Sequence, residues 1–123
     1  MTGRRRIVVV DDNPDAANTL ATILRMSGHE VHIATDGHSA IELAIRVRPE
    51  VMLLDIGLPG LDGFSVAKRL RAESSLAHMR IIAVTGIGDE GDRQRAMEAG
   101  IDQHLIKPVD PAFLQSLLGP AGR

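Results

Sequence analysis

The feature of this sequence that most limits its fold is a regular alternation of short apolar runs with segments of helical spacing. The apolar runs are those at residues 7–10, 31–34, 51–54 and 81–84, with a weaker fifth run that ends at residue 106. Between them, apolar residues recur three and four positions apart, as in the segment 17–24. Strands and helices that alternate with short connections predict an α/β fold, with a parallel sheet covered by helices on both faces.

The composition of each run predicts its place in the sheet. Central parallel strands are covered on both faces and are therefore continuously apolar, as the first, third and fourth runs are. His32 interrupts the second run, and Gln103 and His104 begin the fifth, as expected of edge strands. We therefore predict a doubly wound, five-stranded parallel sheet with the order 2-1-3-4-5, numbered along the chain, and five helices. This is the flavodoxin-like arrangement.

Length, charge and cysteine content limit the classes of function. A chain of 123 residues fits a single domain over residues 1–123, with a core over about residues 5–118. The net charge of −2 gives no general attraction to nucleic acid or membrane, and the short basic run at residues 4–6 is expected to be a solvated start to the first strand. No cysteine is present, and no apolar run approaches the roughly 20 residues needed to span a bilayer. These features predict a cytoplasmic protein that binds neither nucleic acid nor membrane directly.

Polar residues gather where the predicted strands end. Asp11 and Asp12 follow the first run, and Asp55 follows the third. Thr85 ends the fourth run and Lys107 the fifth. Because ligands of this fold class bind outside the carboxyl ends of the strands, we expect these five side chains to converge.

Three carboxylates at one place require a positive charge nearby. Oxygen ligands without histidine or cysteine suit a hard cation, so we expect magnesium, Mg²⁺, which commonly uses one or two carboxylates beside phosphate groups. Such an ion would align a phosphoryl donor as a carboxylate attacks phosphorus, while Lys107 stabilises the same phosphoryl oxygens. Helix capping could explain Asp12 by itself, but it does not explain Asp55, Thr85 and Lys107 as a set.

Four stretches carry a family resemblance: Val10-Asp11-Asp12-Asn13, residues 54–63 (LDIGLPGLDG), Val84-Thr85-Gly86 and Ile106-Lys107-Pro108. They resemble the receiver domain of bacterial two-component response regulators across essentially the whole chain. The resemblance implies that Asp55 accepts a phosphoryl group from a histidine kinase or a histidine phosphotransfer protein. It also implies that Asp11, Asp12, Asp55 and the backbone carbonyl of Gly57 hold Mg²⁺, while Thr85 and Lys107 bind the phosphoryl oxygens.

The resemblance further implies a switch rather than a separate enzyme. Such a domain promotes its own phosphorylation and dephosphorylation, Thr85 moves toward the phosphate, and the face formed by the fourth helix, fifth strand and fifth helix rearranges and binds a downstream protein. The Lys107-Pro108 peptide bond is expected to be cis. The residues around Asp55 and Pro108 are similar to receivers attached to hybrid histidine kinases, so both a stand-alone regulator and a piece of such a kinase remain open.

Three residues depart from the usual family pattern. His104 stands where receivers usually have tyrosine or phenylalanine as a switch residue, and we expect it to be a surface residue of an edge strand. Gly86 follows Thr85 where alanine is more common, and Gly57 places no side chain above Asp55. Both glycines are expected to admit water, which predicts a short-lived phosphoaspartate.

Three other interpretations fit the sequence less well. Residues 86–91 spell GxGxxG, but this motif follows the fourth strand, and its acidic pair Asp89-Glu90 would oppose a dinucleotide pyrophosphate. An aspartyl-nucleophile phosphatase would place its two acids two positions apart, whereas Asp11 and Asp12 are adjacent. A pure binding module would leave the acid cluster unexplained. The histidines at 29, 32, 38 and 78 lack the spacing of metal ligands and are expected at the surface.

Overall fold

The computed structural model of the chain describes residues 5–58, 60–86 and 93–118. The elements in chain order are β1 (Arg6–Val10), α1 (Pro14–Met26), β2 (Glu30–Ala34), α2 (Gly37–Val47), β3 (Val51–Asp55), α3 (Gly63–Arg71), a short 3₁₀ turn (Ser74–Leu76), β4 (Arg80–Thr85), α4 (Arg93–Ala99), β5 (Gln103–Ile106) and α5 (Pro111–Leu118). Each run of apolar residues thus contributes one strand, and each intervening segment contributes a helix.

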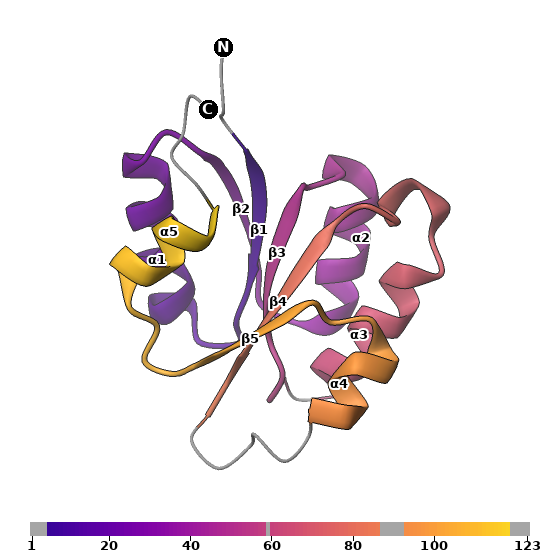
Figure 1. Cartoon of the computed structure of the whole chain (residues 1–123). Helices are drawn as coiled ribbons and strands as arrows, with labels where there is room; N and C mark the ends of the chain where they lie inside the picture. The colour runs from indigo at the N-terminus through magenta and orange to yellow at the C-terminus, as the bar shows by residue number, and fades with distance from the viewer. Residues whose placement is uncertain (1–4, 59, 87–92, 119–123) are drawn as a thin grey trace.

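The five strands form one parallel sheet with the order β2-β1-β3-β4-β5, which confirms the predicted topology (Figure 1). β1 lies between β2 and β3, and Val10 is in register with Ala34 on one side and Leu54 on the other. On its other side β3 pairs with β4, where Asp55 is opposite Val84. The chain therefore reverses its direction of winding between β1 and β3, and Asp11 and Asp55 leave the sheet on either side of this point.

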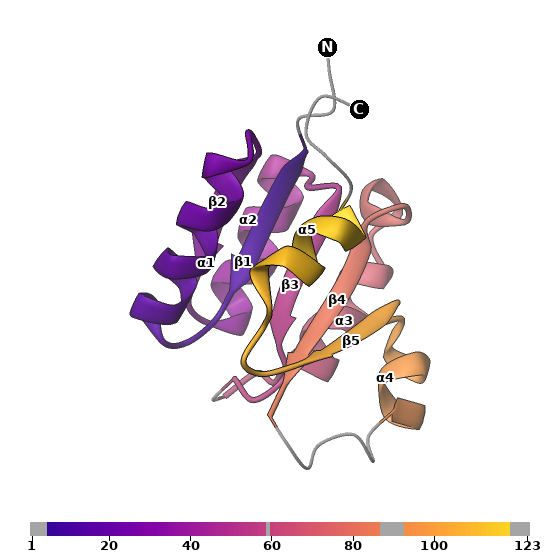
Figure 2. The same cartoon turned by 60° about the vertical axis from the view of Figure 1, so that its left-hand side comes forward.

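Helices cover both faces of the sheet, as Figures 1 and 2 show: α1 and α5 lie on one face, and α2, α3 and α4 lie on the other. Successive residues of a strand point to opposite faces. Ile7 and Val9 accordingly belong to the core beneath α1 and α5, while Val8 and Val10 belong to the core beneath the other three helices. This double burial explains why the central strands β1, β3 and β4 are polar only at their first or last residues.

Side-chain caps fix the starts of three helices. Asn13 accepts hydrogen bonds from the backbone N–H groups of Asp15 and Ala16 at the start of α1, and Pro14 is the first residue of the helix. Asp36 caps α2 through the N–H of Ser39, and Asp62 caps α3 in the same way through Ser65. These caps leave the first turns of α1, α2 and α3 pointing toward the carboxyl edge of the sheet.

The prediction that every histidine outside the fifth strand lies at the surface is wrong for His29, which is only 5% exposed. The turn between α1 and β2 places its ring against the start of β1, where Nδ1 accepts a hydrogen bond from the Arg5 N–H at 3.3 Å. Tertiary packing of this turn, rather than the local pattern, decides its burial.

Several expectations concern parts of the chain without a described structure. Arg4 of the basic run, most of the GxGxxG stretch (residues 87–91) and residues 119–123 lie outside the described residues. Within the described part of the chain, none of the helices combines the length and the apolar character that crossing a membrane requires.

Candidate functional site

Asp11 is held at the carboxyl end of β1 by two backbone hydrogen bonds. Its own N–H donates to the Ala34 carbonyl at 3.2 Å and continues the pairing of β1 with β2. Its Oδ1 accepts a hydrogen bond from the Asn13 N–H at 2.9 Å. The Asx turn that begins α1 therefore also orients the Asp11 carboxylate.

Asp55 is the last residue of β3, and its carboxylate has a partner on each oxygen. The Gly57 N–H donates to Oδ1 at 2.9 Å, and the Lys107 ammonium donates to Oδ2 at 3.0 Å. The residue is only 6% exposed. A buried carboxylate with an ammonium partner and a backbone donor is fixed in one orientation at the switch point of the sheet.

The structure brings the three predicted acids together. Asp11, Asp12 and Asp55 each offer one carboxylate oxygen, and these atoms all lie within 4.8 Å of one another. Burial raises the pKa of Asp11 above its usual value, and the negative charges of Asp55 and Asp12 add to this, against the lowering effects of the Asn13 N–H and Lys107. Clustered hard oxygen donors with one disfavoured negative charge fit a divalent cation such as Mg²⁺.

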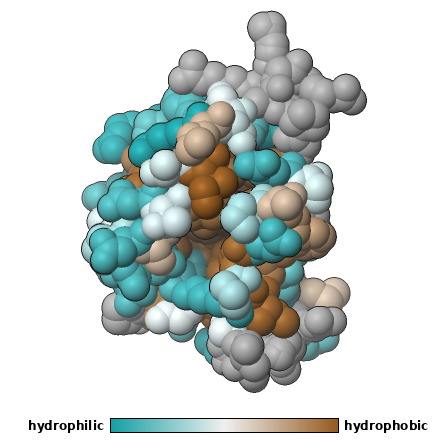
Figure 3. Space-filling model, turned by 90° about the vertical axis from the view of Figure 1, so that its left-hand side faces the viewer, coloured by the Kyte–Doolittle hydropathy of each residue, from teal (hydrophilic) through white to brown (hydrophobic). Residues whose placement is uncertain are grey.

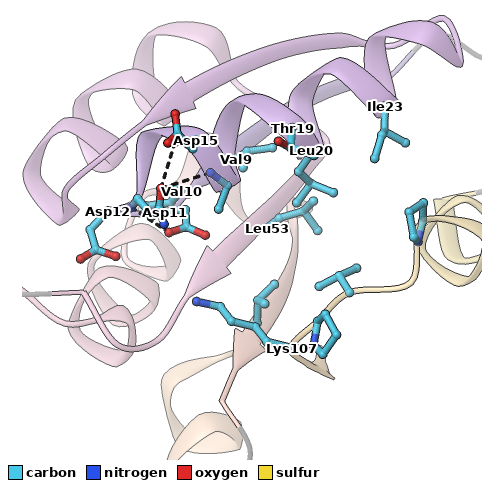
Figure 4. Close-up of a pocket in the computed structure, with 16 residues that line it drawn as sticks. Val9, Val10, Asp11, Asp12, Asp15, Thr19, Leu20, Ile23, Leu53 and Lys107 are labelled. Carbon is cyan, nitrogen blue, oxygen red and sulfur yellow. Dashed lines mark hydrogen bonds between the residues drawn. The ribbon is translucent and has the colours of Figure 1, made fainter.

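Lys107 directly follows β5 and extends its side chain toward the acids, as Figure 4 shows. Partial burial alone would lower its pKa, but the hydrogen bond to Asp55 and the charges of Asp55, Asp11 and Asp12 outweigh that effect and raise it. Its backbone N–H donates to the Thr85 carbonyl at 2.7 Å, and the Lys107-Pro108 peptide bond is cis. Lys107 is therefore a positive charge anchored to β4 through its own backbone.

Thr85 ends β4, and His104 lies in the neighbouring strand β5. The Thr85 hydroxyl is buried and lies 3.5 Å from the Leu105 carbonyl oxygen, at the limit of a hydrogen bond. His104 is half-buried in β5, in register with Ala83. Because Ala83 belongs to the core beneath α2, α3 and α4, His104 lies on the face of the sheet that carries α4.

A groove of about 900 Å³ runs from this site between α1 and the segment that joins β5 to α5. Its apolar part includes Leu20, Ile23 and Leu53, while Asp11, Asp12 and Asp15 gather at one end (Figure 4). On the face that carries α1 and α5, the molecular surface shows a hydrophobic hollow between hydrophilic flanks (Figure 3). The acid cluster is thus reached from solvent beside an apolar surface.

Sequence reasoning missed two backbone features of the site. The Gly57 N–H is a donor to Asp55 in addition to the carbonyl that was expected to bind metal. Gly63, at the start of α3, packs so closely that a Cβ there would lie 2.7 Å from the Ile56 Cα and 2.9 Å from the Asp55 carbonyl oxygen. A glycine that follows a capping aspartate would have been the only signal of this approach.

Comparison with known proteins gives consistent results. The family model of the response regulator receiver domain matches residues 7–118. The chain is 36% identical over 109 residues to the response regulator PleD of Caulobacter vibrioides, covering 89% of this chain and 24% of PleD. It is 37% identical over 113 residues to the DNA-binding response regulator MtrA of Mycolicibacterium smegmatis, covering 92% of this chain and 48% of MtrA. The chain thus spans less than half the length of these relatives.

Solved structures agree with the sequence comparison. The receiver domain of the sensor histidine kinase PA1611 from Pseudomonas aeruginosa PAO1, solved with magnesium in its active-site cleft, superposes with a TM-score of 0.84 at 36% identity and covers 94% of both chains. The Vibrio cholerae chemotaxis protein CheY4 gives a TM-score of 0.88 at 27% identity, over 94% of this chain and 96% of that one. The sheet order, the family match and these structures lead to one conclusion: the chain belongs to the family of response regulator receiver domains, which are signalling domains of two-component systems.

Proposed function

We propose that these residues form a single phosphoacceptor domain, with a core over about residues 5–118, in which Asp55 receives a phosphoryl group from a histidine kinase or a histidine phosphotransfer protein. The observation that carries the proposal is the Asp55 carboxylate, which is buried, hydrogen-bonded to Lys107 and within reach of two further carboxylates. Among the clustered acids Asp55 alone is held by an ammonium group, so its oxygens lie where phosphoryl charge would be compensated.

The clustered carboxylates of Asp11, Asp12 and Asp55 are suited to hold the Mg²⁺ ion that the family uses, and the family resemblance adds the backbone carbonyl of Gly57 as a fourth ligand. When bound, the ion would offset negative charge on the acids and on the incoming phosphoryl group. Asn13 supports this role indirectly, because its N–H keeps the Asp11 carboxylate oriented toward the cluster.

The transfer itself requires little covalent chemistry from the protein. An Asp55 carboxylate oxygen forms the new P–O bond while the P–N bond to the donor imidazole breaks, and the bonding electron pair leaves with the imidazole nitrogen. The Lys107 ammonium, now 3.0 Å from Asp55 Oδ2, would turn to the phosphoryl oxygens, and the Thr85 hydroxyl would rotate toward them. Water attack on phosphorus later returns Asp55 to its carboxylate form.

The surface expected to bind a downstream protein lies around β5, because Lys107 directly follows this strand and Thr85 ends the neighbouring strand β4. Apolar side chains are exposed on each element of the expected face: Met97 on α4, Ile106 on β5 and Phe113 on α5. Movement of Thr85 toward a phosphoryl group would alter the β4–β5 edge beneath this face, and His104 on the same edge strand is the candidate second switch residue. We expect a downstream protein to bind there.

Three expectations about the cellular context stay predictions. One is the cytoplasmic location, and another is whether the domain acts alone or as a piece of a hybrid histidine kinase. The third is the absence of direct nucleic-acid contact, which concerns these residues only, because a relative such as MtrA is a DNA-binding regulator.

The proposal is tested by incubating the protein with acetyl phosphate and Mg²⁺ and measuring its intact mass. Wild type should gain one phosphoryl group, and the gain should disappear when Mg²⁺ is chelated. Asp55→Asn should gain none, while Asp15→Asn, a matched change at a groove residue outside the cluster, should be labelled like wild type. Labelling of Asp55→Asn at the wild-type level would show that another residue accepts the phosphoryl group.

A further inference from the structure

A second glycine, Gly37, contacts the segment that leads away from the acceptor, although it lies on a different helix. Gly37 is the first residue of α2 and is buried. A Cβ atom built on it would lie 2.6 Å from the Leu61 carbonyl oxygen and 2.9 Å from the Val66 Cγ2. These separations are shorter than Cβ atoms show in proteins, so a side chain at this position must displace its neighbours.

The backbone of Gly37 does not itself require glycine. In the described chain the glycines with positive φ are Gly28, Gly60 and Gly100, so Gly37 has a conformation that alanine adopts readily. Alanine would also have the higher helix propensity. What excludes a larger residue is therefore the close approach of α2 to Leu61 and Val66.

The close approach of α2 to Leu61 and Val66 affects the position of Asp55 through two stretches of backbone. Leu61 belongs to the segment between Gly57, whose N–H holds Asp55, and Asp62, which caps α3. Val66 belongs to α3, whose first residue, Gly63, touches the backbone of Asp55 and Ile56 and donates to the Ile56 carbonyl at 3.3 Å. Both ends of the segment are thus fixed, one by Gly63 and the other by the start of α2.

The start of α2 is itself held in place, so a side chain at position 37 would displace the Leu61 backbone and not α2. Asp36 accepts hydrogen bonds from both the N–H and the hydroxyl of Ser39, at 2.8 and 3.0 Å. Ala40, Leu43 and Ala44 bury the same helix against the sheet. The neighbour at 2.6 Å is a backbone oxygen, which cannot rotate away as a side chain can.

We propose that Gly37 is a positioning residue for the phosphoacceptor site: the missing side chain lets α2 hold the Leu61 backbone and α3 in place, and through Gly63 the backbone of Asp55 and Ile56. The inference rests on the proposed function, because it concerns metal binding and phosphoryl transfer at that site. Gly37 touches neither the metal nor the phosphoryl group, and its effect is exerted through Leu61 and α3.

The experiment compares wild type, Gly37→Ala and His38→Ala, an exposed neighbour in the same helical turn. Mg²⁺ affinity is measured by calorimetric titration, thermal stability without metal by circular dichroism, and labelling by acetyl phosphate through intact mass. Gly37→Ala should bind Mg²⁺ about tenfold more weakly, the size typical when support of a metal ligand is lost, and should be labelled more slowly. His38→Ala should match wild type in all three.

A folded Gly37→Ala that binds Mg²⁺ as wild type does would overturn the proposal, since a purely structural glycine would alter stability alone. Equal weakening in His38→Ala would overturn it as well. Absence of label on wild type would instead refute the proposed function, whatever the variants do.

A double variant covers the case in which Gly37→Ala folds poorly. Gly37→Ala/Val66→Ala adds one methyl group and removes two, among them the Val66 Cγ2 that the new methyl would meet, but it keeps the conflict with the Leu61 carbonyl. It should regain stability and still bind Mg²⁺ weakly. If the double variant regains both stability and Mg²⁺ affinity, the conflict is with Val66. If neither variant folds, Gly37 is a packing residue. Either result contradicts positioning through Leu61.

Discussion

The Lys107 ammonium donates a hydrogen bond to Asp55 Oδ2 at 3.0 Å, although 52 residues separate the two in sequence. Lys107 is the more exposed partner, with 42% of its side chain accessible compared with 8% for Asp55. The pair therefore lies at the protein surface, with the carboxylate buried and the ammonium group partly open to solvent. In the proposed transfer, this contact would also align the ammonium group with the incoming phosphoryl oxygens.

Lys107→Ala should slow phosphorylation of Asp55 by about a hundredfold, because one preorganised charge that stabilises the transferring group is lost. The same variant should bind Mg²⁺ at least as tightly as wild type, since a cation that repels the metal has been removed. Acetyl phosphate labelling and calorimetric titration check the two effects separately. A parallel loss of metal affinity would show that Lys107 acts by organising the acids and not on the phosphoryl group.

Asp11→Asn should make the metal-free protein more stable. The change removes one of three carboxylates whose oxygens lie within 4.8 Å of one another, while the amide oxygen can still accept from the Asn13 N–H. We expect the melting temperature to rise by about 1–4 °C in the presence of a chelator. Added Mg²⁺ should stabilise wild type and have little effect on Asp11→Asn; the matched variant Asp15→Asn should retain the full Mg²⁺ effect.

Gly57→Met should lengthen the lifetime of the phosphoaspartate several-fold. A Cβ at position 57 would meet only the Asp55 Oδ1, at an ordinary contact distance of 3.6 Å, so a larger side chain fits and would shield the acceptor from water. The backbone carbonyl and N–H stay available to the metal and to Asp55. Loss of label over time, followed by intact mass after removal of acetyl phosphate, gives the two half-lives. An unchanged half-life would mean that water reaches phosphorus by another route.

The order of the sheet and the acid cluster could both be predicted, for one physical reason. A continuously apolar strand is buried on both faces, and this distinguishes central strands from edge strands. In a parallel sheet, the chain leaves every strand at the same edge of the sheet. Asp11, Asp55 and Lys107 were therefore predictable as neighbours from their positions alone. The order of the strands alone places these three residues at one edge of the sheet.

Features that depend on backbone approach or on packing between distant segments were not predictable. The burial of His29 results from the way the α1–β2 turn lies against Arg5. Every residue type except proline has a backbone N–H, so the sequence does not show that the Gly57 N–H donates to Asp55. The contacts of Gly37 arise where α2 approaches Leu61 and α3, and no local sequence pattern encodes this approach.

Arg95→Met should destabilise the domain by about 0.5–1 kcal/mol through loss of a cation–π contact. The Arg95 guanidinium lies 4.3 Å from the centroid of the buried Phe64 ring, and it also pairs with Asp62 at 3.7 Å. The ion pair is exposed, so it should add little and weaken with salt. Urea unfolding of Arg95→Met, Phe64→Leu and the double variant measures the coupling; additive effects would show that the ring contact contributes nothing.

His29 should make the domain less stable in mild acid. Burial, followed by the positive charge of Arg5, lowers the pKa of this imidazole, and Glu50 opposes the shift only in part. Between the ordinary histidine pKa of about 6.5 and the lowered value, the unfolded chain therefore binds more protons than the folded one. Stability is complete above this window and is lost as pH falls through it.

Protonation of His29 would also remove the acceptor for the Arg5 N–H, while the Arg5 side chain donates to the Leu118 carbonyl at 2.6 Å at the end of α5. His29→Asn keeps an acceptor close to the position of Nδ1 and does not titrate. Urea unfolding from pH 7.5 to 5 should show a clear loss of stability for wild type and a flatter profile for His29→Asn. His38→Asn, a change at an exposed histidine, should retain the wild-type slope, and an equal flattening in both variants would assign the acid sensitivity to general charge rather than to the buried ring.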